Sequence, residues 1–119
     1  MITVNGKEYG LFLSVDAMMQ IAKLCPGENL ERLNDVLYSD NFSESITATI
    51  GFVCALSAGH EARTAFLDAG YEPEPLTPEK LSNIALPELW AARQAGIEAF
   101  NAGLKVTVEA ETPKKKEGQ

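Results

Sequence analysis

The sequence predicts a mainly α-helical fold, a small domain of five to six helices with an N-terminal β-hairpin. The first observation is an uncharged stretch at residues 45–59, SITATIGFVCALSAG, whose apolar side chains cover a broad arc when it is drawn as a helix. The second is a series of segments that begin with helix-capping residues and end at glycine or proline. The third is an Asn-Gly pair between two short extended runs near the N-terminus. Residues 45–59 are therefore expected to form the buried central helix.

The length of 119 residues favours one domain, expected over residues 1–111, with a disordered tail at residues 112–119. As a helix, residues 45–59 would be ~22 Å long at ~1.5 Å per residue, which is shorter than the ~30 Å hydrocarbon core of a bilayer. The stretch is therefore interpreted as a core helix and not as a membrane span.

The N-terminal hairpin is predicted from Asn5 and Gly6, which separate residues 2–4 from residues 7–13. Asn-Gly provides the two positive-φ residues of a type I′ turn, whose twist matches that of the paired strands. A lone hairpin is only marginally stable in water. This hairpin is therefore expected to lie on the helices that follow.

Two helices are predicted between the hairpin and the central stretch. Ser14 is expected to cap the first, which Pro26 and Gly27 end, because a hydroxyl side chain accepts from a free N–H of the first turn. Asn29 is expected to cap a second, shorter helix in the same way. The apolar positions of this shorter helix are Leu30, Leu33, Val36 and Leu37.

The central helix is expected to begin at Asn41 or Ser43 and to end at Gly59. Gly51, in its middle, costs roughly 1 kcal/mol relative to alanine. Two explanations are open for Gly51 and the alanines on the same arc. They allow another backbone to approach closely, or they simply face water.

Residues 61–69 predict a further short helix in which Phe66 points inward, with Gly70 as its C-terminal cap. The proline-rich residues 71–75 cannot continue a helix, because each proline restricts its own φ and the residue before it. This stretch is therefore expected to cross the surface without regular structure.

Thr77, followed by proline and glutamate, predicts the start of a short helix. A last helix is expected from Pro87 to Gly103. Beyond it, residues 104–109 alternate between apolar and polar side chains, which predicts a strand.

The formal net charge of −7 argues against nucleic acid and against an anionic membrane as partners, because both bind basic surfaces. Cys25 and Cys54 form no close metal-type or redox pair, so both are expected to be buried free thiols, as suits a reducing cytosol. The N-terminus has neither a basic region nor an apolar run of the kind found in a signal peptide, so none is expected.

No catalytic constellation is recognisable in the sequence. His60 is the single histidine and no nucleophile is implied beside it, so it is expected to be a solvated loop residue. The glycines do not form a phosphate-binding loop. The sequence therefore predicts no enzyme and no catalytic, cofactor-binding or metal-binding residue.

The candidate functional residues lie on the last predicted helix and would bind another protein. They are Trp90, Arg93, Ile97 and Phe100. Trp and Arg are enriched at interface hot spots, and these two lie one helical turn apart on an apolar face. The alternative is that this face belongs to the core, with the stem of Arg93 packed and its guanidinium reaching water.

Several features occur together in one order along residues 2–104. They are the Asn-Gly hairpin, the capped helix start SVDA at residues 14–17, the helix end ALSAG at residues 55–59, the motif LTPEKL at residues 76–81, and the Ala-rich last helix ending near Gly103. This arrangement resembles the tail assembly chaperones of long-tailed bacteriophages.

The resemblance implies a protein that is not an enzyme. It implies binding to the tape-measure protein, recruitment of tail-tube subunits, action in the cytoplasm of the bacterial host, and absence from the finished virion. Self-association is a further possibility. Two other classes stay open: a minor virion structural protein (a head–tail completion or minor tail component), and a small host-directed regulatory protein.

Many members of that family are also made in a longer form by programmed ribosomal frameshifting. The three consecutive lysines at residues 114–116 require an unbroken purine run in the message, into which a slip site fits. The resemblance implies that such a longer product would engage the tail-tube protein. The alternative is that the lysines are only a soluble basic end.

Overall fold

The computed structural model describes the backbone of residues 1–117 and the side chains of residues 1–105. The protein is mainly helical with an N-terminal two-stranded antiparallel hairpin, so the predicted fold class is confirmed. The elements in chain order are β1 (Ile2–Val4), β2 (Lys7–Tyr9), α1 (Val15–Ala22), η1 (Pro26–Glu28), η2 (Leu30–Arg32), α2 (Leu33–Leu37), α3 (Phe42–Leu67), α4 (Pro78–Leu81) and α5 (Leu86–Glu117).

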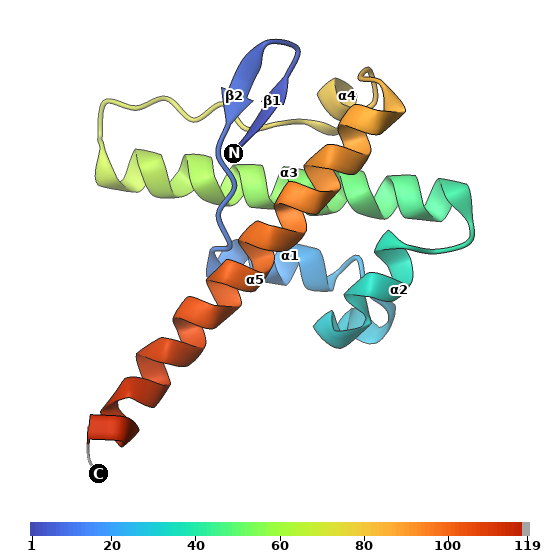
Figure 1. Ribbon diagram of the computed structural model, residues 1–119. Coiled ribbons are helices and arrows are strands. Elements are labelled where there is room, and N and C mark those ends of the chain that lie inside the picture. Colours follow the sequence, from blue (N-terminus) through green and yellow to red (C-terminus); the bar gives the residue numbers. More distant parts are fainter. Residues whose placement is uncertain (118–119) are drawn as a thin grey trace.

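Helix α3 is the centre of the fold, as predicted for residues 45–59. Figure 1 shows α5 crossing it obliquely, with α1 and α2 on one side and the hairpin on the other. Helices α1, α2, α4 and α5 all contact α3. The largest fully buried side chains include five from α3, namely Thr49, Phe52, Val53, Leu56 and Ser57.

The hairpin and the helix starts follow the local signals in the sequence. Asn5 and Gly6 have φ values of 51° and 83°, as a type I′ turn requires. Ser14 accepts a hydrogen bond from the N–H of Ala17 at 3.0 Å and caps α1. The other predicted caps, also confirmed, are Asn29, Asn41 and Thr77.

The predicted end of the central helix at Gly59 is wrong, because α3 continues without a break to Leu67. Gly59 is buried where the chain after the hairpin crosses α3, and the Phe12 N–H donates to the Leu56 carbonyl oxygen at 3.0 Å. A Cβ at Gly59 would lie 2.4 Å from the Phe12 carbonyl oxygen. Gly59 therefore serves a close backbone approach and does not end the helix.

Gly51 is also explained by packing, although its neighbour is a side chain and not a backbone. A Cβ at Gly51 would lie 2.9 Å from Cδ2 of Leu24, which follows α1. The explanation that this part of α3 faces water is therefore wrong for Gly51.

The segment after Gly59 differs from the prediction in two ways. Residues 61–67 belong to α3 and not to a separate helix. Phe66, expected to point inward, is 89% exposed, because this end of α3 projects past the other helices. The expected crossing at residues 71–75 is confirmed and has no regular structure.

Helix α5 continues past Gly103 to Glu117, so the strand expected at residues 104–109 is wrong. A helix pairs its backbone groups within itself, whereas a lone strand has no partner for them. Gly103 lies against the segment that precedes α1, and a Cβ at Gly103 would be 2.6 Å from Cβ of Leu13. Within the expected tail at residues 112–119, the backbone is helical to Glu117, and residues 118 and 119 lie outside the described part.

At 26 residues, α3 is long and apolar enough to span a membrane by length and composition. Residues 45–59 alone are too short to span a bilayer, whereas the whole of α3 is long enough. In the most apolar 18-residue window, 56% of the residues are buried inside the protein. Such burial is typical of the core helix of a folded domain, so one helix of this kind is weak evidence for a membrane span.

Candidate protein-binding surface

Arg93 joins α5 to the end of α2. Its guanidinium lies between two aromatic rings, 4.1 Å from the Tyr38 ring centroid and 4.2 Å from the Trp90 ring centroid. Its Nη1 also donates to the carbonyl oxygen of Leu37 at 3.0 Å. Leu37 ends α2, where a cation is favoured by the unpaired carbonyls and by the helix dipole. Arg93 therefore holds α2, α5 and the two rings together.

Trp90 is half-buried and borders a surface formed by α3 and α5. Phe42, the first residue of α3, meets it edge-on with ring centroids 6.5 Å apart. The Phe42 side chain is 62% exposed. Trp90 thus has one face held by Arg93, and its ring supports an exposed aromatic side chain.

The four predicted site residues are not one surface. Trp90, Arg93 and Ile97 are half-buried, whereas Phe100 is 8% exposed and packs against Phe52 of α3 at a centroid distance of 6.0 Å. Phe100 is therefore a core residue, and its assignment to a binding surface is corrected. The face of α5 therefore belongs to the core at Phe100, whereas it reaches the surface at Trp90.

A groove between α3 and the α4–α5 region opens beside Phe42 and has a volume of about 210 Å³. We call it the α3–α5 groove. Figure 1 shows α4 and the first turns of α5 over the N-terminal half of α3. The groove is lined almost entirely by large apolar side chains, namely Phe42, Ile46, Ile50, Leu81, Ile84, Leu86 and Leu89, together with Ser82.

The residues that α3 contributes to this surface are not among the predicted site residues. Phe42, Ile46 and Ile50 recur every fourth residue, which places them on one face of a helix. The broad apolar arc that residues 45–59 are expected to turn toward the core includes Ile46 and Ile50, and both are only partly buried. The sequence feature that could have indicated this surface is the spacing of four residues that starts at Phe42, directly after the Asn41 cap.

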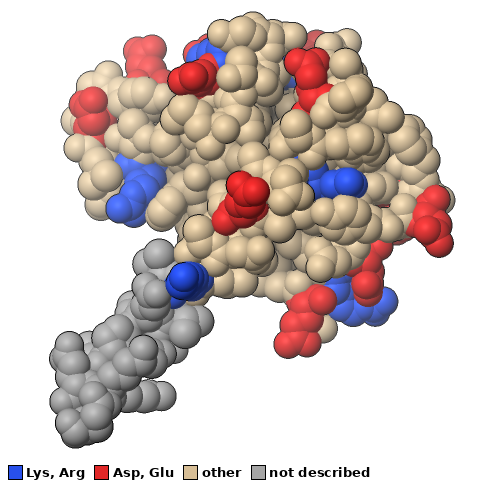
Figure 2. Space-filling view, in the orientation of Figure 1, with Lys and Arg blue, Asp and Glu red and all other residues tan. Residues whose placement is uncertain are grey.

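Figure 2 shows the face seen in Figure 1, on which charged side chains are scattered, with an acidic one near the centre and uncharged surface between them. A second depression, of about 420 Å³, lies between α3 and the chain around α1 and α2. Its lining is more polar and includes Asn41, Ser43, Glu44 and Thr47. Asn41 and Glu44 are occupied there by capping and turn contacts, because Asn41 Oδ1 accepts from the Glu44 N–H and Glu44 accepts from the Ser39 hydroxyl.

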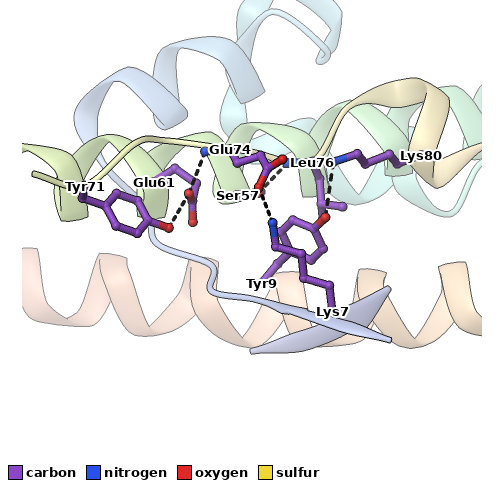
Figure 3. Close-up of polar contacts among 8 residues, drawn as sticks. All are labelled: Lys7, Tyr9, Ser57, Glu61, Tyr71, Glu74, Leu76 and Lys80. Atoms are coloured by element: carbon purple, nitrogen blue, oxygen red, sulfur yellow. Dashed lines mark hydrogen bonds and ion pairs between the residues drawn. The ribbon is translucent and has the colours of Figure 1, made fainter. Parts of the chain in front are cut away.

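A polar network fastens the crossing at residues 71–76 onto α3 (Figure 3). The carboxylate of Glu61, which is 5% exposed, accepts from the Tyr71 hydroxyl at 2.6 Å and from the Glu74 N–H at 2.9 Å. Ser57 Oγ accepts from the Leu76 N–H at 2.9 Å. These bonds satisfy buried polar groups of α3 with groups of the crossing, so the network is structural.

Burial alone would raise the pKa of Glu61, but the hydrogen bonds from Tyr71 and from the Glu74 N–H outweigh it and lower the pKa below its ordinary value of 4.5. The ion pair with Lys7 of the hairpin lowers the pKa of Glu74. The folded pKa of Glu61 lies below the unfolded pKa. Its contribution to stability is therefore complete above the unfolded pKa and is lost as the pH falls through the folded pKa.

We expect Glu61→Gln to lower the free energy of unfolding by roughly 1–2 kcal/mol near neutral pH, because a charged acceptor makes the stronger hydrogen bonds. The difference from the parent protein should shrink as the pH falls from the unfolded pKa of about 4.5 through the lower folded pKa, because Glu61 then becomes protonated in the parent as well. Urea unfolding at a series of pH values measures this. Glu72→Gln, on the exposed part of the same crossing, is the control. Parallel pH profiles for Glu61→Gln and the parent would contradict the assignment.

The titratable groups of the described side chains do not gather into a reactive site. Among them no group of three or more His, Cys, Asp or Glu could hold a metal ion. Neither cysteine forms a disulfide; Cys25 is buried as predicted, whereas Cys54 is only half-buried. Burial raises the pKa of Cys54 to about 11, so its thiol stays protonated near neutral pH. His60 is a helical residue of α3 and not a loop residue, and its ring covers Gly10, where a Cβ would lie 2.4 Å away.

Comparison of the chain with known protein families, with curated proteins and with solved structures gives no match.

Proposed function

We propose that this protein is a tail assembly chaperone of a long-tailed bacteriophage, which binds the tape-measure protein, keeps it soluble and helps to recruit tail-tube subunits without catalysing a reaction. The proposal starts from the arrangement of motifs along residues 2–104. The observation that carries it furthest is the exposed apolar surface at the start of α3, where Phe42, Trp90 and the α3–α5 groove meet. Exposed apolar surface of this kind is typical of protein-binding sites.

The charge of the protein supports the same role. An excess of acidic residues, with a net charge of −7, keeps an apolar client soluble once the chaperone has bound it. The proposed place of action is the cytoplasm of the bacterial host, before the tail is complete. A longer product made by frameshifting at residues 114–116 would carry the contact with the tail-tube protein.

Co-expression tests the proposed function. We expect the tape-measure protein of the same phage to be insoluble when expressed alone and soluble, in a complex, when this protein is co-expressed. Val53→Asp is the matched control, because it differs from the parent protein at one residue but should be strongly destabilised. A tape-measure protein that stays insoluble with the parent protein would overturn the proposal.

The composition of purified virions separates the two alternatives. A chaperone is absent from finished particles, whereas a head–tail completion or minor tail protein remains in them. A host-directed regulator would be absent from particles but would leave the tape-measure protein insoluble in the co-expression experiment.

A further inference from the structure

We propose that the α3–α5 groove binds the apolar face of an amphipathic helix whose flanks carry lysine or arginine. The inference deepens the proposed function, on which it rests for the identity of the client: the bound helix would belong to the tape-measure protein. The geometry and charge of the groove can be tested without that client.

The shape of the groove favours side chains of a partner over a small molecule. Its volume of about 210 Å³ lies below the ~300–1,000 Å³ usual for small-molecule sites. Its lining is apolar, apart from Ser82, and comes from α3, α4, α5 and the connection between α4 and α5. Phe42 and Leu86, 62% and 41% exposed, leave apolar surface available to a partner.

The walls of the groove favour a helix over a strand as the bound element. A strand is usually bound by adding to the free edge of a sheet through backbone hydrogen bonds. Here the long walls are the helices α3 and α5, whose interior backbone groups are paired within each helix. Recognition must therefore use side chains, and an amphipathic helix presents apolar side chains in a row at every third or fourth position.

The charges near the groove favour a basic partner. Asp40 is exposed two residues before Phe42, and Glu79 is exposed one helical turn before Ser82. The two basic residues that lie close in sequence to groove-lining residues already contact other groups of the protein. Arg93 is held by two rings and the Leu37 carbonyl, and Lys80 donates to the Tyr9 hydroxyl at 3.4 Å. Lysine or arginine beside the apolar face of a partner would complement the carboxylates.

The same carboxylates disfavour a second copy of this chain as the occupant. Two copies joined at the α3–α5 groove by a two-fold axis would each bring Asp40 and Glu79 to one interface. The net charge of −7 on each copy adds to that repulsion. A basic helix would instead be attracted to these carboxylates, so we propose a basic helix as the occupant of the groove.

A peptide titration tests the inference directly. The probe is a synthetic helix without tryptophan, with leucine on one face and lysine on both flanks. Its partner probe has the same leucines but glutamate flanks. Trp90 is the single tryptophan of the chain and touches Phe42, so its fluorescence reports occupancy of the groove. We expect the lysine-flanked helix to bind at least about tenfold more tightly, with the advantage falling as salt increases.

Two variants and a matched control locate the binding. Phe42→Ser and Leu86→Ser replace exposed residues, so both should fold, as circular dichroism checks. Each should weaken the lysine-flanked helix by about tenfold, as measured by calorimetry. Phe66→Ser is the control, because Phe66 is the same residue type on the same helix and more exposed, but lies ~36 Å further along α3 at ~1.5 Å per residue. Its affinity should match that of the parent protein.

Several outcomes would overturn the inference. Equal losses for Phe42→Ser and Phe66→Ser would indicate unspecific apolar binding, and equal affinity for both peptides would remove the charge argument. A dimer of the parent protein that Phe42→Ser dissociates would identify a second copy as the occupant. Full solubilisation of the tape-measure protein by Phe42→Ser and Leu86→Ser would refute the groove but leave the proposed function intact. Failure of the parent protein to solubilise the tape-measure protein would refute the proposed function. The peptide titration would still show whether the groove binds a basic amphipathic helix.

Discussion

Val53→Asp is expected to remove a large part of the stability of the protein. Val53 lies at the middle of α3 and is fully buried, with Phe52 and Leu56 beside it in the same core. An unpaired buried carboxylate costs roughly 3–5 kcal/mol, against a total stability of about 5–15 kcal/mol for a small domain. Thermal and urea unfolding followed by circular dichroism measures the loss.

Thr47→Asp is the matched control for Val53→Asp. Thr47 lies on the same helix but is exposed, so a carboxylate at this position stays in water and carries no burial cost. The control should unfold at nearly the same temperature as the parent protein. A Val53→Asp variant that melts within a few degrees of the parent would show that α3 is not the buried centre of the fold.

Gly59→Ala is expected to destabilise the protein by roughly 1–3 kcal/mol, although alanine by itself favours a helix by about 1 kcal/mol. The new methyl group would lie 2.4 Å from the Phe12 carbonyl oxygen and 3.1 Å from the Ser14 hydroxyl oxygen. The backbone of this segment would have to move away from α3. That movement would strain the Phe12–Leu56 hydrogen bond and the cap of α1.

Gly51→Ala provides the comparison, since it is the same change in the same helix. There the methyl group meets the end of the Leu24 side chain, which can change its rotamer, so the net change should stay within about 1 kcal/mol. Urea unfolding of the two variants side by side measures the difference. Equal effects at Gly51 and Gly59 would contradict the close backbone approach at Gly59.

The elements that the sequence predicted well depend on neighbours within a few residues. A type I′ turn needs only Asn5 and Gly6, and the caps at Ser14 and Asn41 act on an N–H three residues ahead. Gly59 was misassigned because a glycine that ends a helix and a glycine that admits a crossing chain look alike in sequence. Only the long-range contact with Phe12 distinguishes them.

The candidate surface could be predicted only in part, because it too depends on contacts between residues that are distant in sequence. The spacing of Trp90 and Arg93 placed them correctly on one face of α5, and their residue types indicated an interface. Their actual neighbours are distant in sequence, because Arg93 binds Leu37 and Trp90 meets Phe42. Phe100 shares the helical spacing of the others, but the crossing of α3 and α5 places it against Phe52. The spacing of apolar residues along one helix does not show which of them a neighbouring helix will cover.

Hydrogen–deuterium exchange of this protein, free and in complex with the tape-measure protein, tests the central claim most directly. The claim is that a client helix occupies the α3–α5 groove. We expect binding to slow exchange in residues 42–50 and 81–89, which line the groove, and to leave residues 60–67 at the projecting end of α3 unchanged. Slower exchange at residues 60–67, with none at residues 42–50 and 81–89, would contradict the claim.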